Sequence, residues 1–307
     1  MPALTRWMLL FAVPLALLGT QAACLEFQQT RHEYKEKAFG YTEVDGVRLH
    51  VRELGPTGES AGNVVFIHGY AGGLVSWLYT QPALATRFRT LALDLKGFGL
   101  TDKLDGDYSL AAEAELIVHL MDQKGIDKAH LVAHSWGCAV ALELARRHPE
   151  RVQKLVLTSG FVYEDQLNGF LRWSRVPGLG ELLYGLFYNA QLEARYTWSY
   201  FEPERHVTAK GFGYLHDFQD TPGIKAAALA VLRGMELDAL RPAFARIEQR
   251  ALLIWGREDR VSPPPFGERL VTELPHARLV VLERSGHNVM LERAGTYEQL
   301  VAEFLTP

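Results

Sequence analysis

The sequence contains little cysteine: only Cys24 and Cys138 occur among its 307 residues. Two cysteines exclude the disulfide framework that stabilises many small secreted domains. Neither sign of charge dominates, since the formal net charge is −4 at pH 7. There is therefore no electrostatic case for a nucleic-acid partner. Internal repeats and low-complexity tracts are also missing, which excludes solenoid and fibrous architectures.

The N-terminal residues 1–23 differ from the rest of the chain. Arg6 precedes the apolar run Trp7–Leu18, and small residues follow it. That run is shorter than the roughly 20 residues that a membrane-spanning helix needs. A basic start, a short apolar stretch and small residues are typical of a secretory signal peptide. We therefore expect residues 1–23 to be a signal and the protein to be exported by a bacterium, with a buried helix of the mature fold as the alternative.

The end of this segment, "QAAC", resembles the cleavage site of a bacterial lipoprotein signal. Cys24 stands where such a signal has its lipidated cysteine, although Gln21 occupies a position that is usually aliphatic. Lipidation at Cys24 and ordinary cleavage after Ala22 or Ala23 both remain open. The expected locations are accordingly periplasmic, membrane-anchored or secreted, with membrane association through the N-terminus.

Beyond residue 40 the pattern alternates between short apolar runs and amphipathic stretches. An Asp45-Gly46 turn joins two strand-like runs, which is a strong hairpin signal. Strands are predicted at 63–69, 129–134, 152–160, 251–256 and 277–283, and a further strand run at 90–99 that ends in a glycine turn. Helices are predicted at 109–125, 136–149 and 296–305. This alternation predicts an α/β fold with a mostly parallel twisted sheet flanked by helices.

The alternation is interrupted once, between residues 160 and 250. No strand-like run occurs there, and the stretch is too long to be a simple loop in a compact domain. We predict an inserted helical cap at 162–248, above the strand ends where such sheets bind ligands. The core then consists of residues 24–161 and 249–307.

The stretch "AHSWGCAVAL" places a serine between a predicted strand and a predicted helix. Small residues, Ala133 and Gly137, stand on either side at the spacing that a sharp turn needs. A turn of this kind holds the hydroxyl at the sheet edge and points the helix N-terminus toward any anion bound there. The pattern favours Ser135 as a nucleophile, with an ordinary helix N-cap serine as the alternative.

These features resemble the α/β-hydrolase fold family, whose nucleophile lies on such a strand–turn–helix element. The stretch "FIHGYAGG" follows a strand, as the oxyanion loop of that family does. The resemblance implies that the backbone N–H groups of Tyr70 and Trp136 form the oxyanion hole. The stretch "DLKGFGLTD" resembles the turn after the next strand of that family, and its turn chemistry indicates structural roles for Asp94, Gly97 and Gly99.

The acid and the base of a catalytic triad follow in the chain order of that family. "LLIWGREDRVSP" ends a strand in acidic residues, and the resemblance makes Asp259 the residue that orients the catalytic histidine, with Glu258 as its rival. "ERSGHNVMLERA" places His287 in a turn after the last strand, as the general base. His130 and His134 lie on a strand, so they do not form a helical metal-binding pair.

The implied chemistry is acyl transfer through Ser135, and no cofactor or metal is expected. A serine nucleophile excludes the branches of the family that use aspartate. The eleven aromatic residues between Phe161 and Phe201 either pack the cap onto the core or form an apolar pocket. We expect a serine hydrolase that cleaves a hydrophobic carboxylic ester. The alternatives are a carbon–carbon bond hydrolase or an acyltransferase with the same triad, and a non-catalytic binding protein.

Overall fold

The computed structural model describes residues 25–27, 39–56, 62–207 and 221–306. The predicted signal at 1–23 and the lipidation candidate Cys24 lie outside the described residues, as does part of the predicted cap (208–220). Within the described ranges, no helix has the length and apolar character that crossing a bilayer requires.

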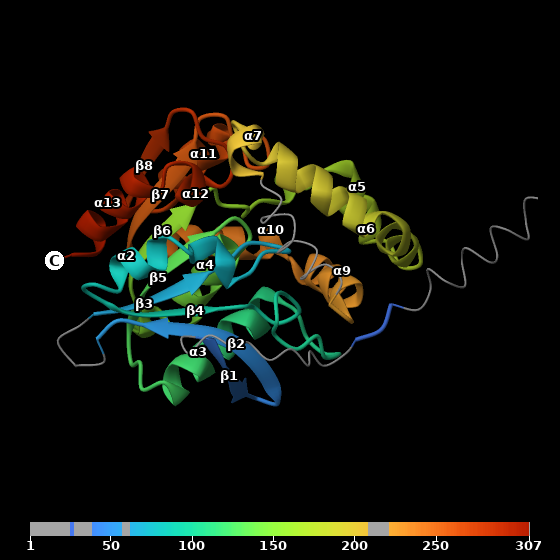
Figure 1. Ribbon diagram of the computed structural model, residues 1–307, viewed down its shortest axis with the longest axis horizontal. Helices are drawn as coiled ribbons and strands as arrows, with labels where there is room; N and C mark the ends of the chain where they lie inside the picture. Colours follow the sequence, from blue (N-terminus) through green and yellow to red (C-terminus); the bar gives the residue numbers. More distant parts are fainter. Residues whose placement is uncertain (1–24, 28–38, 57–61, 208–220, 307) are drawn as a thin grey trace, which may run out of the picture.

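An eight-stranded sheet runs through the described part of the chain (Figure 1). Its order is β1-β2-β4-β3-β5-β6-β7-β8. β2 is antiparallel to both neighbours, and the pairs from β4 to β8 are parallel. The bounds are β1 Phe39–Val44, β2 Val47–Leu54, β3 Asn63–Ile67, β4 Arg89–Leu93, β5 Ala129–His134, β6 Val152–Thr158, β7 Arg250–Gly256 and β8 Ala277–Leu282. The predicted α/β fold with a mostly parallel sheet is confirmed.

Helices cover both faces of this sheet, because its strands carry apolar side chains on both sides. In β3, Val65 and Ile67 pack with α3 and α4, whereas Val64 and Phe66 pack with α2 and α13. The helices are α2 Thr80–Leu84, α3 Leu110–Gln123, α4 Gly137–Arg147, α5 Gly169–Ser174, α6 Leu179–Trp198, α7 Pro203–His206, α9 Ile224–Gly234, α10 Leu237–Leu240, α11 Pro264–Glu273, α12 Val289–Glu292 and α13 Ala294–Leu305.

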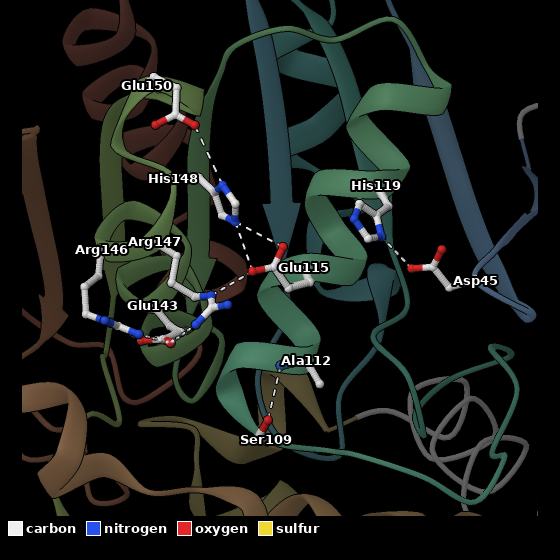
Figure 2. A network of polar contacts seen from close by, with 10 residues as sticks. All are labelled: Asp45, Ser109, Ala112, Glu115, His119, Glu143, Arg146, Arg147, His148 and Glu150. Atoms are coloured by element: carbon white, nitrogen blue, oxygen red, sulfur yellow. Dashed lines mark hydrogen bonds and ion pairs between the residues drawn. The ribbon is translucent and has the colours of Figure 1, made fainter.

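Local sequence signals explain several of these boundaries. Asp45 and Gly46 both have positive φ, of 51° and 77°, which is the geometry of a two-residue hairpin turn between β1 and β2. Ser109 caps α3, because its hydroxyl accepts a hydrogen bond from the N–H of Ala112 at 3.2 Å (Figure 2). The predicted hairpin and the predicted helix start are both present.

Polar contacts on the outer surface join α3 to α4 (Figure 2). The carboxylate of Glu115 accepts hydrogen bonds from Arg147 at 2.7 Å and from His148 at 3.0 Å. The contact with His148 holds the pKa of Glu115 below its usual range. Because these side chains are partly exposed, each contact stabilises the fold only modestly.

On the same helix, Glu113 has the opposite environment. It is almost fully buried, and burial raises its pKa from 4.5 to about 8, with only partial opposition from Lys96. The unfolded chain loses this proton near pH 4.5, whereas the folded protein keeps it until about pH 8. The free energy of unfolding should therefore fall as pH rises across this window.

We expect Glu113→Gln to stabilise the protein by more than about 1 kcal/mol at pH 8 and to have little effect at pH 4. Urea unfolding at the two pH values measures the difference. Glu115→Gln is the matched control, because it removes a carboxylate whose pKa is lowered and should not stabilise. An equal effect of Glu113→Gln at both pH values would contradict the assignment.

Between β6 and β7 the described residues form helices and turns and no strand. Figure 1 shows α5, α6 and α7 arching beyond one end of the sheet, in lime to yellow, with α9 beneath α6. The carboxyl ends of β3 and β5 face this end, since residues that follow them share cavity walls with α6. The described part of the stretch predicted to be a cap consists of helices and turns, and it adjoins those strand ends.

Candidate active site

Ser135 lies on the sharp turn between β5 and α4. Its φ of 53° is unusual for a residue with a side chain, and strained backbone of this kind is common at functional sites. A Cβ on Gly137 would lie 2.4 Å from the carbonyl oxygen of His68, so only glycine fits there. Ala133 is fully buried in β5, and its methyl group is accommodated. The turn therefore has the small residues that its close packing needs.

His287 and Asp259 are joined by a buried hydrogen bond. His287 Nδ1 lies 2.9 Å from Asp259 Oδ2. The other oxygen of Asp259 accepts hydrogen bonds from the backbone N–H groups of Val261 and Ser262, at 2.9 and 2.8 Å. The carboxylate is thus fixed, and it holds the imidazole with Nδ1 as the donor. Nε2 remains available to accept a proton.

Glu258, the rival acid, is directed elsewhere. Its Oε2 accepts a hydrogen bond from the backbone N–H of Ser285 at 3.0 Å. Only Asp259 of this pair contacts His287 among the interactions of the described residues. The geometry therefore favours Asp259 as the orienting acid.

The candidate nucleophile and the candidate base end in polar atoms that have no hydrogen-bond partner among the described residues. Ser135 Oγ and His287 Nε2 are both buried, and neither has a hydrogen-bond partner within the described part of the chain. In enzymes without substrate, the hydrogen bond between nucleophile and base is often long and shortens when substrate binds. Two unpaired atoms of these types fit that state.

The predicted oxyanion donors lie on both sides of the nucleophile. Trp136 follows Ser135 at the start of α4, and Tyr70 follows Gly69 in the loop after β3. A Cβ on Gly69 would lie 2.8 Å from Ser135 Cβ, so this loop passes directly against the nucleophile. Within the described ranges, the backbone N–H groups of Tyr70 and Trp136 donate to no backbone acceptor. Both remain available for a developing oxyanion.

His68 holds that loop in place. Its Nδ1 contacts the carbonyl oxygen of Gly69 at 2.7 Å, and its Nε2 accepts a hydrogen bond from the backbone N–H of Leu95 at 2.9 Å. Burial lowers the pKa of His68, which keeps the ring neutral. A neutral ring with Nδ1 protonated satisfies both contacts.

Two cavities meet at these residues. The inner cavity has a volume of about 440 Å³, and Ser135 and Trp136 contribute to its wall. The outer cavity has a volume of about 640 Å³ and is lined in part by His287. Tyr70 and Arg195 line both. A reacting carbonyl at their junction can place one part of a substrate in each cavity.

Comparison with known proteins agrees with this geometry. The model of the alpha/beta hydrolase fold family matches residues 62–294, which is most of the chain. This protein is an α/β-hydrolase. The resemblance predicted from the sequence is thereby confirmed.

Relatives of this α/β-hydrolase have several activities. It is 30% identical to 2-hydroxy-6-oxo-6-phenylhexa-2,4-dienoate hydrolase of Burkholderia cepacia over 84% of this chain and 91% of that one. It is 31% identical to the dihydrolipoyllysine-residue acetyltransferase component of the acetoin cleaving system of Pseudomonas putida, over 86% and 68%. The solved meta-cleavage product hydrolase of Pseudomonas fluorescens IP01 aligns with a TM-score of 0.73 and 26% identity, over 88% and 98%.

Arg195 is a residue of the hydrolase that sequence reasoning missed. It continues the inward face of α6 after Tyr184, Tyr188 and Leu192, which are all buried. The guanidinium lies over the ring of Tyr70, 5.8 Å from its centroid. Burial lowers the pKa of Arg195, but arginine keeps its charge in proteins. One feature of the sequence could have identified Arg195: it follows Tyr188 and Leu192 at the spacing of a single helix face, so a charged residue occupies a position where an apolar one is expected.

The charge of Arg195 is only partly compensated, because Asp259 raises the pKa of Arg195 through space against the larger effect of burial. Among the described residues, Arg195 forms no ion pair, although it is flanked by aromatic side chains and faces both cavities. A charge in such surroundings is costly without a partner. The inner cavity, which Ser135 also lines, therefore contains a cation that a bound anion can neutralise.

The sequence left two roles open for the aromatic residues of the cap, namely packing against the core and lining a substrate pocket. Tyr184 and Tyr188 are buried and line the inner cavity, and the hydroxyl of Tyr184 lies 2.7 Å from that of Tyr70 in the core. These residues both pack the cap onto the core and form the pocket. Trp173 and Phe187 instead point to solvent, with exposures of 63% and 48%.

Proposed function

We propose that this α/β-hydrolase cleaves a carbon–carbon bond next to a ketone, in a substrate that also carries a carboxylate. The observation that supports this proposal is Arg195, a cation without an acidic partner in the described chain, at the junction of the two cavities. A neutral ester would leave Arg195 without an ion pair, whereas a substrate carboxylate would pair with it directly and fix the orientation of the substrate.

The relatives support the same class of reaction. The name of the Burkholderia cepacia relative describes a substrate with a carboxylate at one end and a 6-oxo group carrying phenyl at the other. Such a compound contains no ester or amide bond, so its hydrolysis must break a carbon–carbon bond beside the ketone. The proposed substrate shares that combination of ketone and carboxylate.

The residues of the site can perform this chemistry in two stages. Ser135 Oγ attacks the ketone carbon while His287 takes its proton, and the backbone N–H groups of Tyr70 and Trp136 stabilise the oxyanion. Collapse of this intermediate breaks the adjacent carbon–carbon bond. This requires the 2-keto tautomer of the substrate, formed when the 2-hydroxyl proton moves to the carbon beside the ketone. The released electron pair is then delocalised through the remaining double bond onto the 2-keto oxygen, and His287 returns the proton of Ser135 to the carbon chain. Water then hydrolyses the ester at Ser135 and releases a carboxylic acid.

Ester hydrolysis is the second candidate. The inner cavity is lined largely by apolar side chains, including Phe161, Leu171 and Leu232, and would accept a hydrophobic acyl group. The same acyl-enzyme would also allow acyl transfer to an acceptor other than water. The sequence-based expectation of a carboxylic ester hydrolase is not confirmed, and the relatives favour the carbon–carbon alternative. The hydrogen-bonded His287–Asp259 pair argues against a non-catalytic binding protein.

Arg195→Gln tests the proposal. We expect kcat/KM for 2-hydroxy-6-oxo-6-phenylhexa-2,4-dienoate to fall at least about 100-fold, because loss of one member of a buried charge pair costs about 2–5 kcal/mol. Hydrolysis of neutral p-nitrophenyl acetate should change less than about threefold by the same argument. Arg195→Lys should recover part of the loss for the anionic substrate.

Arg260→Gln is the matched control, because Arg260 is an exposed arginine on the wall of the same inner cavity. It should leave both rates nearly unchanged. Equal losses on the neutral and anionic substrates in Arg195→Gln would show that Arg195 is structural. If the unaltered enzyme hydrolysed neutral esters rapidly and did not cleave the ketone acid, the result would favour ester hydrolysis as the function.

A further inference from the structure

The fully exposed residues of α6 are uncharged, and half-buried Glu193 is the charged residue that borders them. Seven residues of α6 are exposed, and none of them is acidic or basic: Leu186, Phe187, Ala190, Gln191, Ala194, Thr197 and Trp198. The solvent-facing side of a surface helix usually carries charged residues. On α5, which packs against α6, Trp173 is 63% exposed, and Val176 just beyond it is also exposed. We call Trp173, Val176, Leu186, Phe187 and Trp198 the cap face.

The described chain begins near α9, which packs against α6. Phe27 stacks on Tyr108, with ring centroids 5.9 Å apart. Tyr108 lies against the last residue of α9, because a Cβ on Gly234 would lie 2.4 Å from the backbone carbonyl oxygen of Tyr108. The next residue, Arg233, pairs with Glu181 at the start of α6 at 2.7 Å. Figure 1 shows the short blue segment 25–27 beside α9, on the same side as the start of α6.

The sequence before Leu25 is suited to a lipid partner. The full-length chain carries the twelve-residue apolar run Trp7–Leu18, and removal of the expected signal before Cys24 leaves that residue, a candidate for lipidation, at the N-terminus. A single acyl chain gives only marginal membrane binding, and stable anchoring needs a second contribution. Exposed tryptophan and phenylalanine supply such a contribution, because aromatic side chains favour the membrane–water interface.

We propose that the cap face lies on the surface of a lipid bilayer, with the N-terminal segment attached to the same membrane. The docked partner is the bilayer rather than a second copy of the chain, because exposed tryptophan and phenylalanine favour the membrane–water interface and a lipidated Cys24 would attach the start of the described chain to a membrane. Arg172 is exposed next to Trp173 and can contact anionic lipid headgroups. This proposal does not depend on which bond the enzyme cleaves.

The inner cavity opens toward the same face. Its wall includes the exposed residues Gln191, Ala194 and Trp198 of α6, and it extends inward to Ser135. An amphiphile dissolved in the bilayer can therefore enter the cavity without crossing bulk water. If the proposed function holds, the substrate class is a carboxylic acid with an apolar tail long enough to partition into lipid.

The tryptophans of the chain provide a direct test. Of its six tryptophans, Trp77, Trp136 and Trp255 are fully buried, Trp173 and Trp198 are exposed, and Trp7 lies in the apolar run. Full-length Trp7→Phe protein is mixed with vesicles of phosphatidylethanolamine and phosphatidylglycerol whose acyl chains are brominated. We expect quenching of tryptophan fluorescence, and further substitution of Trp173 and Trp198 by phenylalanine should abolish it.

A second measurement tests the contribution of the face to binding. In vesicle flotation, the double variant Trp173→Gln with Phe187→Gln should bind at least about tenfold more weakly, since each buried aromatic side chain contributes about 1.5–3 kcal/mol. Tyr79→Gln is the matched control, because Tyr79 is 60% exposed but lines the outer cavity. It should bind vesicles like the unaltered protein.

Three results would overturn the proposal. The first is vesicle-bound protein whose exposed tryptophans are not quenched. The second is equal flotation of the double variant and the unaltered protein. The third is a dimer in light scattering that the double variant converts to monomer, because the cap face would then contact a second copy. The melting temperatures of the variants establish that the fold is intact, and none of these readouts requires the proposed reaction.

Discussion

Replacing Ser135 with alanine should reduce kcat/KM by about 10⁴- to 10⁶-fold, the loss that follows removal of a serine nucleophile from a complete triad. The physical reason is that no other described group replaces its hydroxyl between the oxyanion donors and His287. The variant should also lose covalent labelling by a fluorophosphonate. The loss of kcat/KM is measured with purified protein, as the turnover of the ketone acid and of p-nitrophenyl esters.

Ser159 is a close structural control for this experiment. Like Ser135, it follows a strand of the sheet, is fully buried and has positive φ, at 48°. Its hydroxyl also has no hydrogen-bond partner among the described residues. Ser159→Ala should keep both activity and labelling. If Ser159→Ala were inactive and Ser135→Ala retained full activity, the assignment of the nucleophile would be wrong.

Replacing Asp259 with asparagine should lower kcat by about 10⁴-fold while leaving KM within a few-fold. An asparagine presents either an amide N–H or a carbonyl to His287, so it no longer stabilises the imidazolium that forms in the transition state. It also stops enforcing the tautomer in which Nε2 accepts the serine proton. Steady-state kinetics at saturating substrate measure this loss.

Glu258→Gln is the matched control, because the neighbouring carboxylate bonds to the backbone of Ser285 and does not contact His287. We expect its kcat to remain within about tenfold of the unaltered enzyme, as is usual for a residue outside the triad. A loss confined to Glu258→Gln, with Asp259→Asn active, would transfer the orienting role to Glu258.

Features that depend on neighbouring residues were determined by the sequence itself. The Asp45-Gly46 turn, the Ser109 cap and the buried strand at 129–134 are all present as predicted. Strands that are apolar on both faces have to lie inside a parallel sheet, so the α/β class followed from short-range pattern. The small residues around Ser135 similarly implied a tight turn before any contact was known.

Only the tertiary structure decided the features that depend on direction and distance. Asp259 and Glu258 are adjacent in the chain, and pattern alone does not say which carboxylate turns toward His287; the backbone N–H groups that bind each one decide this. Arg195 looks like an ordinary helical residue in the sequence, and its unpaired charge between two cavities appears only when α6 packs over the strand ends. The physical reason is the same in both cases: hydrogen bonds and burial between distant segments are set by packing, which local sequence does not encode.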